Sequence, residues 1–210
     1  MPPEQLLGQV KAVRRWARVH VTFDDAFRSI GSVLPGLRDL GVPITIFVCS
    51  GYADRGGAPL LIPELAGDDP EELRTMSWDE LRALAAEGIE IGAHSIGHAH
   101  LIPLDDVALA REVQGPKQRV EDEVGHACRL FAYPYGEHDA RVRAAVCAAG
   151  YERGYALWWR GGDPYATPRV DLYRRHTILQ TLALTAPFRP APREPLQAQE
   201  RSAETGVRSP

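Results

Sequence analysis

The feature that most constrains the fold of this chain is a repeated alternation of short apolar segments with longer segments of helical spacing. The short segments are rich in β-branched or aromatic residues, and their lengths suit strands. Five of them are RVHVTFD (18–24), PITIFVC (43–49), IEIGAH (89–94), CRLFAYP (128–134) and YERGYALWW (151–159). Because strands that alternate with helices pair in parallel, the sequence predicts an α/β protein built on a parallel sheet.

Helical segments are predicted between these strands, at residues 27–40, 78–88, 105–125 and 138–149. Ser77 followed by Glu80 forms a capping box, which marks the start of the second helix. Gly115-Pro116 interrupts the third, so a kink or a division into two helices is expected. Residues 50–75 are predicted to form a loop.

The chain has 210 residues, the length of one domain with a full hydrophobic core. Residues 18–184 are expected to form this domain, with residues 1–17 as an N-terminal extension. From residue 185 the composition shifts to Pro, Arg and Glu with few apolar side chains. This change predicts a disordered tail over residues 185–210.

Charge and hydropathy argue against several classes of partner. The net charge of −4 indicates neither nucleic acid nor a membrane surface, and the short basic run KAVRR (11–15) is interpreted as a solvated face. No apolar run is long enough to span a membrane, and MPPEQLLGQVKAVRRW (1–16) lacks the apolar core of a secretory signal. The three cysteines form no CxxC pair, which is typical of a reducing compartment. A cytoplasmic location is therefore expected.

Polar residues gather where three of the predicted strands end. Asp24-Asp25 lie at the end of the first strand, His94 at the end of the third, and Tyr133-Pro134-Tyr135 at the end of the fourth. In parallel β/α folds the carboxyl ends of the strands share one edge of the sheet, and ligand sites form there. We therefore expect these residues to line a single site.

Asp25, His94 and His98 have the chemistry of a metal site. Carboxylate and neutral imidazole are good ligands for a borderline divalent cation, especially zinc, and three protein ligands leave positions open for water and substrate. The adjacent carboxylates of Asp24 and Asp25 also repel each other and call for a compensating positive charge. The plainer alternatives are that the aspartates start a helix and that the histidines are polar loop residues. His100 is interpreted as a surface residue or as a residue that supports the metal ligands without binding the metal.

Three motifs together resemble those of one enzyme family. TFDD (22–25), HSIGH (94–98) and FAYPYG (131–136) occur in the order typical of NodB-type polysaccharide deacetylases, which are carbohydrate esterases of the family 4 kind. The resemblance extends over residues 18–170. It implies a distorted (β/α) barrel, here with seven parallel strands or fewer. It also implies metal-dependent hydrolysis of an N-acetyl or O-acetyl group on a sugar.

The resemblance further implies a role for each matched residue. Asp24 matches the catalytic base, and Tyr135 matches the residue whose backbone N–H helps to hold the oxyanion. Pro134 shapes that turn beside the substrate. The metal ligands would be Asp25, His94 and His98. Zinc is the expected cofactor, although Co²⁺, Ni²⁺ or Fe²⁺ suit the same ligands.

The sequence departs from the family pattern at several positions. Ala26 replaces the glycine that usually follows the two aspartates, and Ala132 replaces an arginine that tunes the base in many members. Arg169 could supply that arginine from another strand and contact the substrate site. The alternative is a surface salt bridge.

The remaining candidates match less closely. His176, the only histidine late in the chain, is the candidate general acid that protonates the leaving amine, with a structural histidine as the alternative. Trp158 is a candidate for stacking on a sugar, although adjacent tryptophans on a strand face opposite sides and could serve the core and the exterior. Asp163 is interpreted as a turn residue.

The leading hypothesis is a metal-dependent hydrolase that deacetylates an amino sugar or a glycan. A second hypothesis keeps the scaffold and changes the substrate, giving a deformylase or cyclic-amide hydrolase that acts on a small cytoplasmic molecule. A third is an inactive sugar-binding protein that has kept the metal site and lost the general acid. The expected partner is an acylated sugar, without nucleic acid or a membrane span, and the oligomeric state stays open.

Overall fold

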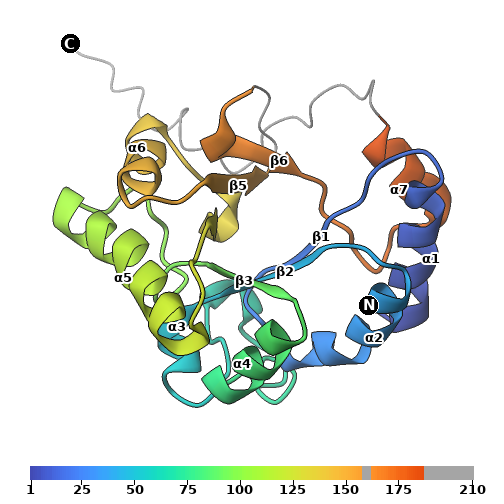
Figure 1. Cartoon of the computed structure of the whole chain (residues 1–210), viewed down its shortest axis with the longest axis horizontal. Helices are drawn as coiled ribbons and strands as arrows, with labels where there is room; N and C mark the ends of the chain where they lie inside the picture. Colours follow the sequence, from blue (N-terminus) through green and yellow to red (C-terminus); the bar gives the residue numbers. More distant parts are fainter. Residues whose placement is uncertain (158–161, 187–210) are drawn as a thin grey trace, which may run out of the picture.

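The computed structural model of this chain describes residues 1–157 and 162–186. At its centre is one sheet of six parallel strands in the order β1-β2-β3-β4-β5-β6. The strands are β1 (Val21–Phe23), β2 (Ile44–Val48), β3 (Glu90–Ala93), β4 (Leu130–Ala132), β5 (Arg153–Leu157) and β6 (Thr167–Arg169). The sheet curls into an open half-barrel with helices on its outside (Figure 1). The predicted distorted (β/α) barrel with no more than seven strands is confirmed.

Helices connect the strands and cover the outer face of the sheet (Figure 1). The α-helices described are α1 (Pro3–Arg14), α2 (Leu34–Asp39), α3 (Ser50–Ala53), α4 (Trp78–Ala86), α5 (Asp106–Val124), α6 (Ala140–Ala148) and α7 (Ile178–Thr185). The 3₁₀ helices are η1 (Arg28–Ser32), η2 (Pro63–Leu65), η3 (Pro134–Gly136) and η4 (Pro164–Ala166). Among the described residues, no helix combines the length and the apolar character needed to cross a lipid bilayer.

Local sequence explains the best-formed elements. All five residues of β2 are buried, as expected for a strand covered by helices on one face and by the barrel interior on the other. At the start of α4 the predicted capping box is present, with Ser77 accepting from the Glu80 N–H and the Glu80 carboxylate accepting from the Ser77 N–H at 2.8 Å. Such a cap satisfies backbone donors that a helix end otherwise leaves without partners.

α5 is not divided at Gly115-Pro116, which was one of the two predicted outcomes. It runs without a break from Asp106 to Val124, with Pro116 inside it. Pro116 is buried, and packing offsets the hydrogen bond that its nitrogen cannot donate. Gly115 lies against the loop after β3, where an added Cβ would come within 3.2 Å of Ile96 Cδ1. The Gly-Pro pair therefore lets α5 approach that loop closely.

Some elements carry little local signal, and the sequence did not predict them. α3 lies inside the predicted loop, and α7 follows a turn that contains His176. β6 has only three residues, TPR, and is defined by its pairing with β5, in which Thr167 faces Tyr155 and Arg169 faces Leu157. Its proline is tolerated because β6 is an edge of the sheet. β1 is the other edge, so we call the space between β6 and β1 the seam.

Candidate metal and catalytic site

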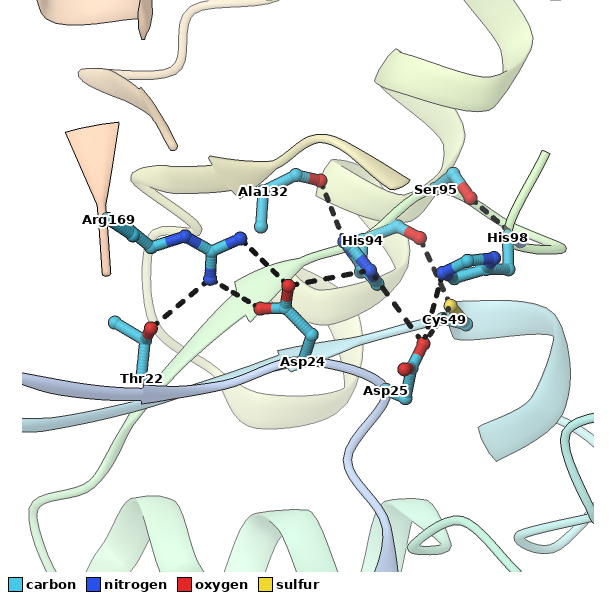
Figure 2. A network of polar contacts seen from close by, with 9 residues as sticks. All are labelled: Thr22, Asp24, Asp25, Cys49, His94, Ser95, His98, Ala132 and Arg169. Atoms are coloured by element: carbon cyan, nitrogen blue, oxygen red, sulfur yellow. Dashed lines mark hydrogen bonds and ion pairs between the residues drawn. The ribbon is translucent and has the colours of Figure 1, made fainter. Parts of the chain in front are cut away.

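The two adjacent aspartates after β1 lie at the start of a strained turn. Asp25 and Ala26 have φ values of 65° and 53°, in the left-handed region that non-glycine residues rarely adopt. Ala26 is fully buried, and its carbonyl accepts a hydrogen bond from the Met76 N–H at 2.8 Å. Such positions cost about 1–3 kcal/mol each and persist only where the surroundings fix them. The turn directs Asp24 toward Arg169 and Asp25 toward the histidines (Figure 2).

The two histidines come from the end of β3 and the loop after it. His94 Nδ1 lies 2.8 Å from the carbonyl oxygen of Ala132. Because that oxygen can only accept, Nδ1 carries a proton, so in the neutral ring Nε2 is the nitrogen that presents its lone pair to the site. His98 has a left-handed φ of 59°, and its N–H donates to Ser95 Oγ at 2.9 Å. Both imidazoles are buried.

Asp25, His94 and His98 converge on one point (Figure 2). Asp25 Oδ1 lies 3.7 Å from His94 Nε2 and 3.5 Å from His98 Nε2, and the three ligand atoms are all within 4.8 Å of one another. Two ligands at about 2.1 Å from a tetrahedral zinc ion are separated by about 3.4 Å. Burial raises the pKa of Asp25 to about 6, against the opposing charge of His94. Burial, with the charge of His94, lowers the pKa of His98 to about 3, so this imidazole is neutral.

Asp24 has a different partner, at the seam. Arg169 donates two hydrogen bonds to its carboxylate, from Nη1 to Oδ1 at 2.6 Å and from Nη2 to Oδ2 at 2.8 Å, and a third to Thr22 Oγ1 at 3.2 Å. Asp24 Oδ2 also lies 3.9 Å from His94 Nε2. Burial alone would raise the pKa of Asp24, but the charges of Arg169 and His94 and the hydrogen bonds from Arg169 hold this pKa below its ordinary value. Asp24 is therefore an ionised carboxylate beside the histidine cluster.

Tyr135 lies in the turn after β4, close to this cluster. Its φ is 60°, and Gly136 is also left-handed with φ 69°. A Cβ on Gly136 would lie 2.6 Å from the Leu157 Cβ, so the turn requires glycine. The Tyr135 ring meets His98 edge-on, with 4.5 Å between ring centroids, and stacks on His100 at 3.8 Å. Pro134 thus introduces a turn that reaches the candidate metal ligands.

Comparison with known proteins assigns the family. A family model described as polysaccharide deacetylase matches residues 13–154. The chain belongs to the polysaccharide deacetylase family. Members are hydrolases that remove acetyl groups from carbohydrates, which places this chain in that class of enzyme.

Solved deacetylase structures share its fold. The Streptococcus pyogenes deacetylase PplD in complex with acetate is similar with a TM-score of 0.73 and 15% identity, covering 88% of this chain and 87% of that one. IcaB from Ammonifex degensii is similar with a TM-score of 0.70 and 20% identity, covering 88% and 89%. The family 4 carbohydrate esterase from Streptomyces lividans in complex with acetate has 25% identity and a TM-score of 0.52, covering 68% of this chain and 63% of its own.

Glu112 is a residue of the candidate site that the sequence did not predict. This buried carboxylate on α5 accepts hydrogen bonds from the N–H of Ile96 at 2.8 Å and, at 3.4 Å, from the N–H of Gly97. Both donors belong to the turn between His94 and His98. Glu112 therefore fixes the backbone that carries the ligands, and nothing in a helical sequence pattern distinguishes it from a solvated glutamate.

Cys49 packs behind Asp25. Its thiol donates to the carbonyl of His94, with 3.1 Å between sulfur and oxygen, and Sγ lies 3.8 Å from Asp25 Oδ1. Burial, reinforced by the charges of Asp25 and Asp24, raises the pKa of Cys49 well above its ordinary value. Cys49 is therefore a protonated thiol that packs against the site.

One predicted residue, His176, lies outside the candidate metal-ligand cluster. His176 is in the turn before α7, where Nδ1 accepts from the Tyr173 N–H at 3.3 Å and its carbonyl accepts from the Gln5 and Gln9 amides. The structure does not bring it into the metal-ligand cluster, and its role as general acid stays a prediction. Trp158 lies outside the described residues. Asp163 is a turn residue, accepting from the Tyr165 N–H at 2.8 Å.

Proposed function

We propose that this family member is a metal-dependent deacetylase that removes an N-acetyl, or O-acetyl, group from an amino sugar or a polysaccharide. The observation that carries the proposal is the convergence of Asp25, His94 and His98 beside the separate, ionised carboxylate of Asp24. One group of side chains is suited to hold a cation, and the neighbouring carboxylate is suited to move a proton.

The three side chains fit a divalent metal ion on chemical grounds. One carboxylate and two neutral imidazoles suit zinc, and cobalt, nickel or ferrous iron are accepted by the same atoms. The tautomer of His94, set by the Ala132 carbonyl, leaves Nε2 available as a ligand. When bound, such an ion supplies Lewis acidity, which polarises the acetyl carbonyl and makes water more acidic.

The chain itself supplies the proton acceptor and its orientation. Asp24 would take the proton from the attacking water, since its carboxylate is ionised. Arg169 engages both oxygens of Asp24 and so holds the carboxylate in one orientation across the seam. The Tyr135 peptide N–H would donate to the oxyanion that develops on the acetyl oxygen, a contribution of about 3–4 kcal/mol at the transition state.

The test measures metal and catalysis separately. Purified full-length protein is analysed for metal by mass spectrometry and assayed for acetate release from chito-oligosaccharides and nucleotide-linked amino sugars. Asp25→Ala should lose the metal and the activity together. Asp24→Asn should keep the metal while the rate falls by about 10²–10⁴-fold.

Two outcomes would overturn the assignment. Full activity after exhaustive chelation would exclude a metal-dependent reaction. Retained turnover in Asp24→Asn would remove Asp24 from the role of base. N-formyl sugars and cyclic amides in the same assay separate the deacetylase from the alternative hydrolases, and release of formate without acetate would favour those alternatives.

A further inference from the structure

A second surface lies on the flank of the molecule formed by α1 and α7. The two helices run side by side at one edge of the fold (Figure 1) and border an apolar groove of about 780 Å³. Gly8, Ala12 and Trp16 line one side, and the other side is lined by Ile178, Leu182 and Ala186. Spacings of four residues on both sides mean that one face of each helix is turned toward the groove.

Several large apolar side chains of this flank are exposed to solvent and do not pack into the domain. The exposed fraction is 44% for Trp16, 48% for Ile178 and 79% for Leu179. α7 has the sequence ILQTLALT without a charged residue, yet Thr181 is the one residue of the helix that is buried. Its start is attached to α1 by hydrogen bonds from the Gln9 amide to the His176 carbonyl, at 2.7 Å, and from Gln5. An uncharged helix with this exposure has an apolar face without a partner in the described chain.

Basic side chains line the groove and flank it along the chain. Lys11 and Arg15 line it, and the same two segments carry four more exposed basic residues, Arg14, Arg18, Arg174 and Arg175. Residues 1–20 and 170–186 contain only two acidic residues, Glu4 and Asp171, although the whole chain has a net charge of −4. Within the described residues, none of the six basic side chains forms an ion pair with a carboxylate.

The fold brings this charge together from distant parts of the sequence. The Gln5 amide donates to the Arg174 carbonyl at 2.9 Å, a contact across 169 positions that places the turn carrying Arg174 and Arg175 against α1. Neither basic run is long enough to indicate a partner by itself. Side by side, they create a local excess of positive charge around an apolar groove.

We propose that the α1–α7 flank docks on an anionic phospholipid bilayer. Trp16, Ile178 and Leu179 would enter the boundary between headgroups and acyl chains, a depth at which tryptophan is favoured. The basic side chains would contact acidic headgroups while their aliphatic stems stay on the apolar surface. Peripheral helices bind bilayers through this combination of apolar area and positive charge. The docking would hold the enzyme at a membrane surface.

A bilayer fits the two features together better than other occupants do. A soluble polyanion would pair with the charges and leave the apolar side chains in water. An apolar peptide would fill the groove and leave six charges unpaired. The 24 residues after Ala186 carry four arginines and three glutamates, so they offer no anionic complement.

The experiment is co-sedimentation of the full chain with lipid vesicles. The protein should pellet with vesicles of mixed phosphatidylglycerol and phosphatidylcholine at low salt and stay in solution with phosphatidylcholine alone. Added salt should release it, since exposed charges are screened. The Lys11→Glu/Arg15→Glu variant should bind these vesicles at least about tenfold more weakly than the unaltered chain. Leu179→Ser should weaken partitioning severalfold without any change of charge, and deacetylation of a soluble substrate should be unaffected in both variants.

A matched variant separates a local site from net charge. Arg111→Glu/Arg153→Glu makes the same change of charge at exposed positions on α5 and β5, and it should bind vesicles like the unaltered chain. Equal loss of binding in this control would overturn the proposal, as would failure of the unaltered chain to pellet. Unchanged binding by Leu179→Ser would indicate a polyanion site instead. A dimer that Leu179→Ser converts to a monomer, without vesicle binding, would make the flank a self-association surface.

Discussion

The paired aspartates of this deacetylase are held in two regions that work by different means. At the rim, where β1 and β3 end, Asp25 faces two imidazoles, and several nearby groups fix them: the Ala132 carbonyl, Ser95 and, through the turn, Glu112. At the seam between the edge strands, Asp24 depends on Arg169, which lies 145 positions away in sequence. The rim is thus supported by several separate contacts, whereas the seam is bridged by one long side chain.

From this difference we expect that substitutions can change metal binding and proton transfer independently. Changes at the rim should remove the cation and, with it, the activity. Changes at the seam should leave the cation in place and slow the reaction. Each prediction below tests one side of this division.

The largest effect should come from a ligand at the rim. His98→Ala removes one of the three proposed ligands, so we expect metal content to fall and acetate release to drop to the level of the blank. His100→Ala is the matched control, because His100 is exposed and pairs with Glu137 at 3.0 Å. The control should keep the metal and most of the activity. A His98→Ala protein with full metal content would place the ligands elsewhere.

A smaller loss is expected at the seam. Arg169→Met removes the two hydrogen bonds to Asp24, so we expect kcat/KM to fall by about 10²-fold with metal content unchanged. Arg169→Lys should lie in between, because an ammonium keeps the charge and loses the two-pronged contact. Steady-state kinetics and mass spectrometry of the metal give both quantities. Loss of metal in Arg169→Met would show that the two regions are not independent.

Loss of the support that α5 gives to the rim should have a more modest effect. Glu112→Ala leaves the N–H groups of Ile96 and Gly97 without their acceptor, so the turn between the ligands should loosen and metal affinity should fall about tenfold. The control is Glu121→Ala, since Glu121 also lies on α5 and accepts a backbone N–H, that of Cys128 at 3.0 Å, away from the ligands. Competition with a chromogenic chelator measures the affinities. Equal affinities in the two variants would exclude a positioning role for Glu112.

The smallest effect should be a shift in thermal stability. Zinc at about 100 times its dissociation constant stabilises the folded state by about 2.7 kcal/mol, which corresponds to a rise in Tm of roughly 5–10 °C. Arg169→Met should keep this rise and Asp25→Ala should lose it. Differential scanning calorimetry with and without chelator provides the comparison. A similar rise in Asp25→Ala would mean that zinc stabilises the chain from another position.

The rim was predictable because its residues lie in short motifs at strand ends. Parallel pairing brings all carboxyl ends to one edge, so a strand followed by Asp24-Asp25 and another followed by His94 must place these residues near each other. Glu112 was not predictable in this way. Its function comes from the close approach of α5 to Ile96, and that approach depends on Gly115 at a position where the sequence suggested a break.

The basic surface at the α1–α7 flank was likewise not predictable from the sequence. A net charge of −4 gave no reason to expect a basic surface, and α7 was not predicted as a helix. The packing of α7 on α1, with the hydrogen bonds from the α1 glutamines to the turn at His176, brings the two basic segments together. Composition averages over the surface, while docking depends on how charge is distributed across it.

The sequence by itself determined the alternation of strands and helices, the parallel sheet and the family motifs, because these follow from local periodicity and from residues close together in the chain. Only the tertiary structure decided that Arg169 of a three-residue edge strand reaches Asp24, that Glu112 supports the ligand turn, and that α1 and α7 share one flank. The physical reason is that each of these contacts joins different elements of the fold, and no single segment of the sequence specifies the pairing. Their free energy comes from burial and pairing, which exist only once the sheet has curled and brought its two edges face to face.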